Sequence, residues 1–543
     1  MNKPEHKEHS KTIKSLEQKA IKGNLLSMFQ LYENYSTGKN VGEINTELAQ
    51  TYLAEIAEKL PSLKFKVNSI NLHEFRRFRN LSIQFDSRMT VIIGDNGAGK
   101  TSIAESLAKT LSWFKENLEK SKVSGKKIIE SDINSNARDY VELIGKFQFD
   151  SNNKFEISLA SPVPGYSGSV SSSVSISKQL GDMYRTVVDS NLLDLPLFAF
   201  YSVERSSVKL PKESLEKALG NSIDSRFKAL KDSLEASTHL KDFTRLYIEL
   251  YNLAEGEETQ EIKEAKQSVQ ALEKLIEKIH RGNNITEDNE LAKELVFQEN
   301  ILKGLLGSKS IKHQKLLTWV NNAIETLVPD VKNLKVDRST GSPRILVDNF
   351  GNRVNISQLS QGQKSLVALT GDLALRLSTL NPDADLPLSA HGIVIIDEIE
   401  LHLHPKWQQQ VLLGLQKTFP NIQFIVTTHS PQILSTVDHK SIRQICFDDE
   451  SELQIKTPQF QTKGVTSADI LARIMETNSI PENIEEAIWL NDFSRFLKVN
   501  DQVSLDNVFR KIKTHFGIQH PVVVDCESQI RIAKMKTRLT KES

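Results

Sequence analysis

The chain has 543 residues, more than one hydrophobic core supports, so we expect two or three structural units. Its 69 basic residues balance 69 acidic ones, and net charge therefore neither favours nor excludes a nucleic-acid partner. Cys446 and Cys526 form no CxxC pair, which argues against a disulfide framework or a zinc hook. No apolar signal segment opens the chain, and no stretch approaches the roughly 18 apolar residues of a membrane span. We therefore expect a cytoplasmic protein with no membrane partner.

Apolar residues recur at helical spacing through residues 12–60. The run from Ala20 to Tyr52 resembles one Sel1-like or TPR-like helical repeat. A lone repeat cannot bury its own apolar face. We therefore expect this segment to pack on the rest of the chain or on a partner.

The most specific motif is a P-loop, Gly94-Asp95-Asn96-Gly97-Ala98-Gly99-Lys100-Thr101. It follows an apolar strand and opens a helix, as phosphate binding by a helix N-terminus requires. Lys100 is expected to reach the β and γ phosphates, and the Thr101 hydroxyl to bind Mg²⁺. The motif predicts ATP and Mg²⁺ as ligands. The residues expected to bind the nucleotide here are Asn96, Gly97, Gly99, Lys100, Thr101 and Ser102.

A second motif, Leu359-Ser360-Gln361-Gly362-Gln363, resembles the LSGGQ signature of ABC ATPases, with Gln361 in the third place. At a helix N-terminus, free N–H groups and the helix dipole would bind the γ-phosphate held by a facing subunit. Taken alone, the pentapeptide also fits an ordinary N-capped helix. We expect Ser360, Gly362 and Gln363 to contact the nucleotide.

A third motif is an apolar strand, residues 392–396, that ends in Asp397 and Glu398, as a Walker B segment does. Buried parallel strands are continuous apolar runs, and their carboxyl ends carry the catalytic groups of α/β proteins. We expect Asp397 to hold Mg²⁺ together with Thr101, and Glu398 to act as the general base on the attacking water.

The segment from Glu400 to Pro405 also contains His402 and His404, a composition that a metal site could use. We favour a D-loop, because Pro405 is well placed to begin a helix. His429 ends another apolar strand and resembles the switch histidine that contacts the γ-phosphate; a structural histidine is the alternative. The predicted catalytic residues are Lys100, Glu398 and His429.

Strand-like segments are expected at Val141–Leu159 and Leu195–Val203, separated by a Ser, Gly and Pro-rich loop over residues 161–177. A charged helical stretch follows, with a short coiled-coil seam formed by Ile262, Ala265, Val269, Leu272, Ile276 and Ile279. Glycines and Pro329 interrupt it, so we expect a compact insertion rather than a long arm. The expected domains are a helical segment over 1–62, an ATPase head over 63–205 and 335–450 with a helical insertion at 206–334, and a helical C-terminal region over 451–543.

In this order the motifs resemble an ABC-type ATPase, and the 260 residues that separate Lys100 from Ser360 make a transporter engine a poor match. The segment Glu74–Phe78 looks like the N-F-R-x-F hairpin of RecF and SMC proteins, and Asp397–Pro431 resembles OLD and RecF-like ATPases. The resemblance implies an α/β fold, an ABC-type P-loop ATPase head (RecF/SMC-like). A Q-loop glutamine stays unassigned; Gln148 lies in a plausible region.

Within this branch, the helical start, the short insertion and a helical tail without a Toprim domain resemble PtuA-type ATPases of Septu anti-phage defence, including those that accompany retrons. The resemblance implies a homodimer or higher homo-oligomer whose nucleotide-driven head dimerisation controls a separate HNH nuclease of the PtuB type. In retrons it implies a reverse transcriptase and multicopy single-stranded DNA or RNA as further partners. Intrinsic nuclease activity is not expected, since the tail offers only Asp525 and Glu527 as an acidic pair.

The alternative function is that of a RecF-like DNA repair or recombination ATPase. In that case Arg76, Arg77 and Arg79 would contact nucleic-acid phosphates, and binding would weaken steeply with salt. A solvated hairpin face is the other explanation of these arginines.

Overall fold

The computed structural model describes residues 11–190, 193–203, 226–235, 240–256, 264–265, 267–273, 276, 290–307, 312–448, 452–477, 480–481 and 483–542. The chain divides into two compact units, Met1–Gly464 and Val465–Ser543. Within the described residues, no helix combines the length and the apolar character that crossing a membrane requires.

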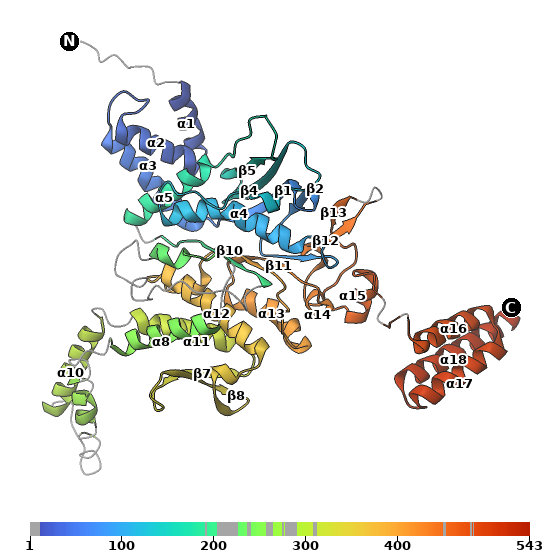
Figure 1. Cartoon of the computed structure of the whole chain (residues 1–543). Helices are drawn as coiled ribbons and strands as arrows, with labels where there is room; N and C mark the ends of the chain where they lie inside the picture. Colours follow the sequence, from blue (N-terminus) through green and yellow to red (C-terminus); the bar gives the residue numbers. More distant parts are fainter. Residues whose placement is uncertain are drawn as a thin grey trace, which may run out of the picture. The chain divides into compact units, whose positions relative to one another are not determined.

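A parallel sheet in the order β13-β12-β3-β11-β10-β6 forms the centre of the first unit (Figure 1). Its strands are β3 (Met89–Ile93), β6 (Leu197–Tyr201), β10 (Gly392–Ile396), β11 (Ile422–Thr427), β12 (Ile442–Phe447) and β13 (Leu453–Lys456). All pairs are parallel except β12 with β13. Every residue of β3, β6, β10 and β11 is buried, because helices cover both faces of the sheet.

Helix α4 (Lys100–Glu119) lies on one face of this sheet, and α12 (Gln361–Leu380) and α13 (Pro405–Thr418) lie on the other (Figure 1). The short helix α14 (Pro431–Leu434) follows β11. The loops after β3, β6, β10 and β11 therefore meet at the carboxyl edge of the sheet, where α/β proteins bind their ligands.

A second, antiparallel sheet has the order β2-β1-β4-β5. Its strands are β1 (Lys66–Phe75), β2 (Phe78–Gln84), β4 (Tyr140–Gln148) and β5 (Lys154–Pro162). The segment predicted as one strand-like stretch, Val141–Leu159, is thus a hairpin of two strands. Aromatic rings join this sheet to α4 and β6, since the Phe65 ring lies 5.0 to 5.5 Å, centroid to centroid, from Phe114, Phe147, Phe149, Phe155 and Phe198.

The N-terminal helices α1 (Lys11–Ile21), α2 (Leu25–Thr37) and α3 (Thr46–Lys59) pack against the ATPase head, as the lone repeat required. They contact α5 (Ser175–Ser190), a helix that begins inside the predicted loop. Asn153, in the β4–β5 turn, is 5 % exposed. Its side chain accepts a hydrogen bond from Leu25 N at 2.7 Å and donates one to Gly23 O at 3.2 Å. This buried amide fixes where the repeat docks.

The insertion region contains α8 (Leu240–Gly256), α10 (Glu290–Gly307) and α11 (Lys312–Leu327), followed by the antiparallel sheet β7 (Val331–Asp337), β8 (Arg344–Asn349) and β9 (Asn352–Asn355). Strand β7 begins before residue 334, so the expected end of the helical insertion falls inside a strand. Of the predicted coiled-coil seam, Ile262 and Ile279 lie outside the described residues. Short 3-10 turns lie at Leu60–Ser62, Glu130–Asp132, Lys228–Leu230, Ile356–Gln358, Pro387–Ser389 and His439–Ser441.

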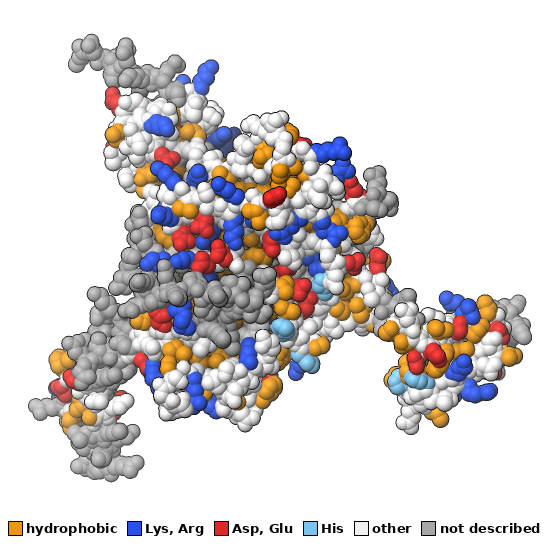
Figure 2. Space-filling model, in the orientation of Figure 1, with side chains coloured by type: hydrophobic (Ala, Val, Ile, Leu, Met, Phe, Trp, Pro, Cys, Tyr) orange, Lys and Arg blue, Asp and Glu red, His pale blue; other side chains and the backbone are white. Residues whose placement is uncertain are grey.

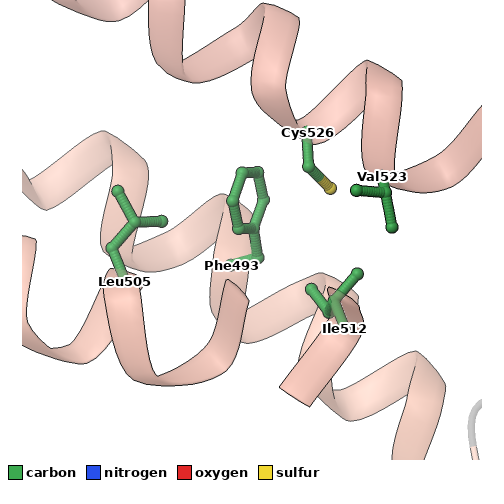
Figure 3. Packing of buried hydrophobic residues seen from close by; sticks show 5 residues of the cluster. All are labelled: Phe493, Leu505, Ile512, Val523 and Cys526. Carbon is green, nitrogen blue, oxygen red and sulfur yellow. The ribbon is translucent and has the colours of Figure 1, made fainter. Parts of the chain in front are cut away.

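The C-terminal unit begins later than expected, because β13 lies beyond residue 450 and still pairs in the sheet of the head. The unit contains α15 (Ser467–Arg473), α16 (Glu485–Val499), α17 (Gln502–Phe516) and α18 (Pro521–Glu542). Its core joins the last three of these helices through Phe493, Leu505, Ile512, Val523 and Cys526 (Figure 3). Both cysteines of the chain are free thiols.

Candidate active site

The P-loop connects β3 to α4 and closes around the lysine side chain. Gly97 and Gly99 have φ angles of 74° and 102°, left-handed conformations that glycine adopts without strain. Lys100 is 6 % exposed, and its Nζ donates to Gly94 O and Asp95 O, both at 2.9 Å. Burial lowers the pKa of the Lys100 ammonium, while nearby carboxylates, Glu398 first among them, act in the opposite direction. The loop thus forms a phosphate-sized cradle at a helix N-terminus.

A hydrogen-bonded group of hydroxyls and one carboxylate lies at the carboxyl edge of the sheet. Thr101 Oγ1 donates to Asp397 Oδ2 at 2.7 Å, and Asp397 is 1 % exposed. Thr427 Oγ1, at the end of β11, donates to the other oxygen of Asp397 at 2.5 Å and accepts from Glu398 N at 2.8 Å. These residues meet because β3, β10 and β11 are neighbours in the sheet. Thr427 was missed by the sequence motifs, although it stands two residues before the predicted switch histidine.

The carboxylates that follow β10 face the lysine and the histidine. Glu398 has a φ of 47°, which turns the chain sharply after the strand. Glu400 Oε1 accepts from His429 N, and Glu400 Oε2 is buried with no hydrogen-bond partner among the described residues. Burial, and then the charge of Lys100, lower the pKa of His429 below its usual range. A neutral His429 at pH 7 follows, held next to the P-loop lysine.

The metal-site alternative for the Glu400–Pro405 segment finds no support in the described residues. No group of three or more His, Cys, Asp or Glu side chains there could hold a metal ion. His402 and His404 are exposed, and His404 Nδ1 accepts from Lys406 N at 3.2 Å as the N-cap of α13. Pro405 begins that helix, as predicted.

The signature segment, residues 359–363, is an N-capped helix start with two exposed and three buried residues. Ser360 caps α12 in a capping box with Gln363, and Ser360 and Gln361 are exposed. Gln363 is 1 % exposed, and its Nε2 donates to Asn349 Oδ1 at 2.8 Å and to Pro329 O at 3.3 Å. A Cβ on Gly362 would lie 2.5 Å from a backbone oxygen in the D-loop. The Gln363 side chain is thus bound within the head and Gly362 is closely packed, while the nucleotide contacts of both residues stay a prediction.

The β1–β2 hairpin approaches the P-loop, and its three arginines have different surroundings. A Cβ on Gly97 would lie 3.7 Å from Arg77 Nη1. Arg76 pairs with the buried Asp132 at 3.0 Å, and Arg79 pairs with Glu452 at 3.2 Å. Arg76 Nη1 also donates to Ser102 Oγ at 3.5 Å, and Arg77 lies next to the glycines of the loop, a difference in position that sequence reasoning did not find. A cavity of about 970 Å³ continues from Arg77 to Asn134, Asn136, Arg138 and Phe447.

Gln148, considered for the Q-loop, ends β4 in the antiparallel sheet, where it pairs with Lys66 and Lys154. The strand that ends next to Asp397, the carboxylate that follows β10, is instead β6. Ser202, just after β6, lines a cavity of about 490 Å³ together with Thr101 and Asp397. The order of the strands in the sheet determines which residues lie near Asp397, and no short sequence motif predicts that order.

The structure thus brings Lys100, Thr101, Asp397, Glu398 and His429 to one edge of the sheet. Asn96, Gly97, Gly99 and Ser102 belong to the same loop and helix start, whereas Ser360 is hydrogen-bonded to Gln363 and Lys364 of its own helix. The site combines glycines in left-handed backbone conformations, a buried ammonium and an adjacent hydroxyl–carboxylate pair. This arrangement fits a nucleoside triphosphate with a divalent cation.

A protein-family model described as "AAA domain, putative AbiEii toxin, Type IV TA system" matches residues 89–435. The chain is 32 % identical over 487 residues to the "Retron Vc95 probable ATPase" of Vibrio cholerae serotype O1 biovar El Tor, which covers 87 % of this chain and 90 % of the relative. It is 29 % identical over 532 residues to the "Retron Ec83 probable ATPase" of Escherichia coli, covering 95 % and 96 %.

Two further comparisons are more partial. A Septu protein PtuA of Bacillus mycoides (strain KBAB4) is 30 % identical over 152 residues, covering 28 % of this chain and 21 % of PtuA. The Smc head domain of Pyrococcus furiosus is 15 % identical with a TM-score of 0.35, covering 72 % of this chain and 96 % of that one. From the family model and the full-length relatives, the chain belongs to the AAA-domain family that includes the retron probable ATPases.

Proposed function

We propose that this protein hydrolyses ATP with Mg²⁺ and that the ATP cycle controls a partner nuclease in a Septu or retron type of anti-phage defence. The observation that carries the first half is the contact of Thr101 with the buried Asp397 directly beside the P-loop lysine. A hydroxyl in the first turn of α4 and a carboxylate directly after β10 supply two oxygen ligands, which is what Mg²⁺ needs next to a triphosphate.

In this proposal each residue of the site has one task. Lys100 leaves the carbonyls of Gly94 and Asp95 and binds the β and γ phosphates. Thr101 and Asp397 hold the cation, which when bound neutralises charge on the phosphates. Glu398 accepts the proton of the attacking water, and the neutral His429 donates a hydrogen bond toward the γ-phosphate.

We propose further that the site is completed by a second copy of the chain. The N-terminus of α12 presents Ser360 and Gln361 to solvent, while its body is buried in the head. An exposed helix N-terminus binds an anion presented to it by a facing surface. A homodimer or higher homo-oligomer then places this end over the partner's γ-phosphate.

The nuclease is assigned to a partner because the described part of this chain offers no second catalytic centre. Glu527, one member of the acidic pair in the tail, is ion-paired with Lys513 at 2.6 Å and with Arg531 at 3.6 Å. Relatives of this chain are named as retron probable ATPases and as a Septu protein PtuA. For this chain we propose the partners that the resemblance to such systems implies: an HNH nuclease of the PtuB type, a reverse transcriptase and multicopy single-stranded DNA or RNA.

The competing function is a RecF-like repair ATPase, favoured by 44 % identity over 46 residues to the DNA replication and repair protein RecF of Leptospira interrogans. Two of the three hairpin arginines are occupied by ion pairs, which leaves Arg77 as the candidate phosphate contact. On the face shown in Figure 2, acidic and basic side chains are interspersed over the described head. That pattern does not resemble a basic stripe for duplex DNA.

The experiment that tests the proposal is affinity purification of the tagged chain expressed from its native operon, with mass spectrometry and extraction of nucleic acid. Recovery of an HNH protein, with or without a reverse transcriptase and single-stranded DNA, is the expected result. Recovery of recombination proteins instead would favour the repair ATPase, and a purified chain that fails to hydrolyse ATP would contradict both.

A further inference from the structure

A buried polar contact joins the catalytic edge of the sheet to the helix that carries the signature segment. Tyr201, the last residue of β6, is 2 % exposed. Its Oη donates to Asp372 Oδ2 on α12 at 2.7 Å, and its main-chain oxygen accepts from Asp397 N at 2.8 Å. One residue therefore holds the predicted cation ligand with its backbone and the signature helix with its side chain.

The carboxylate that receives this hydroxyl belongs to a buried ion pair. Arg376 Nε donates to the same oxygen of Asp372 at 2.8 Å, and Arg376 Nη1 donates to Ala229 O at 2.6 Å and Lys231 O at 2.9 Å. Asp372 is 7 % exposed, so its charge is almost wholly withdrawn from water. Buried ion pairs add little net stability compared with apolar residues of the same shape, but their directional bonds fix one arrangement. Asp372 and Arg376 lie one turn apart on α12, so the bonds that fix the rotation of this helix about its own axis are those to Tyr201, Ala229 O and Lys231 O.

The geometry of α12 carries that arrangement to its exposed end. Ser360 caps the helix and Asp372 lies twelve residues further along it, about 18 Å at the rise of an α-helix. A regular helix between them acts as a rigid lever, so a small change of tilt at Asp372 displaces Ser360 and Gln361. Those exposed residues are the ones that we placed against the nucleotide of a second copy.

We propose that Tyr201 is a positioning residue that couples the cation site at Asp397 to the pose of the signature end of α12. This inference rests on the proposed ATPase function and on a site shared by two copies. Tyr201 does not contact nucleotide in this scheme. Its hydroxyl transmits a shift of the β6–β10 strand ends to α12, so that closure of the dimer follows occupancy of the site.

The test is Tyr201→Phe, which removes one hydroxyl and leaves the ring in place. The matched control is Tyr247→Phe: Tyr247, on α8, is 1 % exposed, and its Oη is hydrogen-bonded to Asn321 Oδ1 at 2.8 Å and to Leu334 O at 3.3 Å rather than to α12 or Asp397. For wild type and both variants we would measure the affinity of the isolated chain for a fluorescent ATP analogue, ATP-dependent dimerisation by analytical ultracentrifugation, kcat and the melting temperature.

Tyr201→Phe is expected to bind the analogue within about twofold of wild type while dimerisation and kcat fall about tenfold, a coupling of ordinary allosteric size. Tyr247→Phe is expected to lower the melting temperature to a similar extent and to leave kcat and dimerisation within about twofold. Equal effects of the two substitutions on kcat would overturn the inference, as would a loss of analogue affinity in Tyr201→Phe that matches the loss of kcat. If wild type itself neither hydrolyses ATP nor dimerises, the proposed function fails rather than this coupling alone.

Discussion

At the scale of single residues, the site depends on carboxylates and bases whose surroundings differ sharply. Asp397 is buried and doubly hydrogen-bonded by hydroxyls, whereas Glu398 begins the turn that leaves the strand. A carboxylate held by two donors keeps its orientation, as a cation ligand must. Glu398, one residue further, is the residue that we propose polarises the attacking water.

We expect Glu398→Gln to bind ATP and to hydrolyse it about a hundredfold more slowly, because the amide preserves shape but cannot accept the proton. Closed dimers should accumulate with ATP, which size-exclusion chromatography with light scattering would detect. Glu255→Gln, at an exposed ion pair with Arg338, is the control and should hydrolyse at the wild-type rate. Hydrolysis at the native rate by Glu398→Gln would show that another group is the base.

Away from the site, His391 gives stability a pH dependence. The residue precedes β10, its Nε2 has no hydrogen-bond partner in the described structure, and burial first, then the charge of Lys64, lowers the pKa of His391 to about 4. The unfolded chain binds this proton near pH 6.5, whereas the folded protein binds it only near pH 4. Above pH 6.5 His391 is neutral in both states and costs no stability. The free energy of unfolding falls as the pH drops from 6.5 towards 4.

Between pH 7 and pH 5 this one group should lower the free energy of unfolding of the first unit by about 2 kcal/mol. Urea unfolding at the two pH values would measure it. In His391→Gln, which cannot titrate, the difference between the two pH values should shrink by that amount. An unchanged difference would mean that His391 accepts a proton in the folded protein at no cost.

At the scale of elements, the signature helix is fastened at several points along its length. Its first turn is tied by Gln363 to the β8–β9 hairpin and to Pro329, and its middle by Asp372 to β6. The motif therefore combines exposed residues that can meet a partner with buried ones that hold the helix. A pentapeptide match does not distinguish these two kinds, because burial depends on the neighbouring hairpin.

Gln363→Leu should destabilise the head by about 1 to 3 kcal/mol, because it leaves the Asn349 side chain and the Pro329 carbonyl without their donor. Differential scanning fluorimetry of this variant beside Gln361→Leu, at the exposed neighbouring position, would separate the two roles. We expect a lower melting temperature only for Gln363→Leu. A wild-type melting temperature combined with lost dimerisation would instead indicate that Gln363 contacts the nucleotide.

At the scale of the whole molecule, two heads must meet for the proposed site to work. The P-loop and the exposed end of α12 belong to the same unit, yet within the described residues Ser360 makes no hydrogen bond to Lys100 or its loop. A two-fold symmetric dimer solves this by pairing each P-loop with the partner's helix end, giving two equal sites.

Mixing Lys100→Ala chains with Ser360→Arg chains tests this arrangement. Each variant alone should be inactive, since one lacks the phosphate-binding ammonium and the other carries a bulky cation at the helix end. In an equal mixture half of the dimers are mixed and each has one intact site, so about a quarter of the wild-type hydrolysis should return. A mixture as inactive as its components would place both motifs in the same chain's site.

The sequence by itself determined the chemistry, because phosphate and cation binding need particular residue types at fixed local spacing. Gly94–Thr101, the strand ending at Asp397 and Glu398, and His429 were all identified from such short patterns, and the α/β ATPase fold followed from them. The buried strands could also be predicted from the sequence, since each is a continuous apolar run.

The tertiary structure alone decided which residues from distant segments share a neighbourhood. Thr427, Arg77 and Tyr201 join the site because β11 and β6 flank β10 and because the β1–β2 hairpin reaches the P-loop. The Gln363 side chain is buried because it binds Asn349 in the preceding β8–β9 hairpin. The β4–β5 turn and the late boundary at Gly464 likewise depend on strand pairing. Pairing forms between segments far apart in the chain, so no local pattern of residues specifies it.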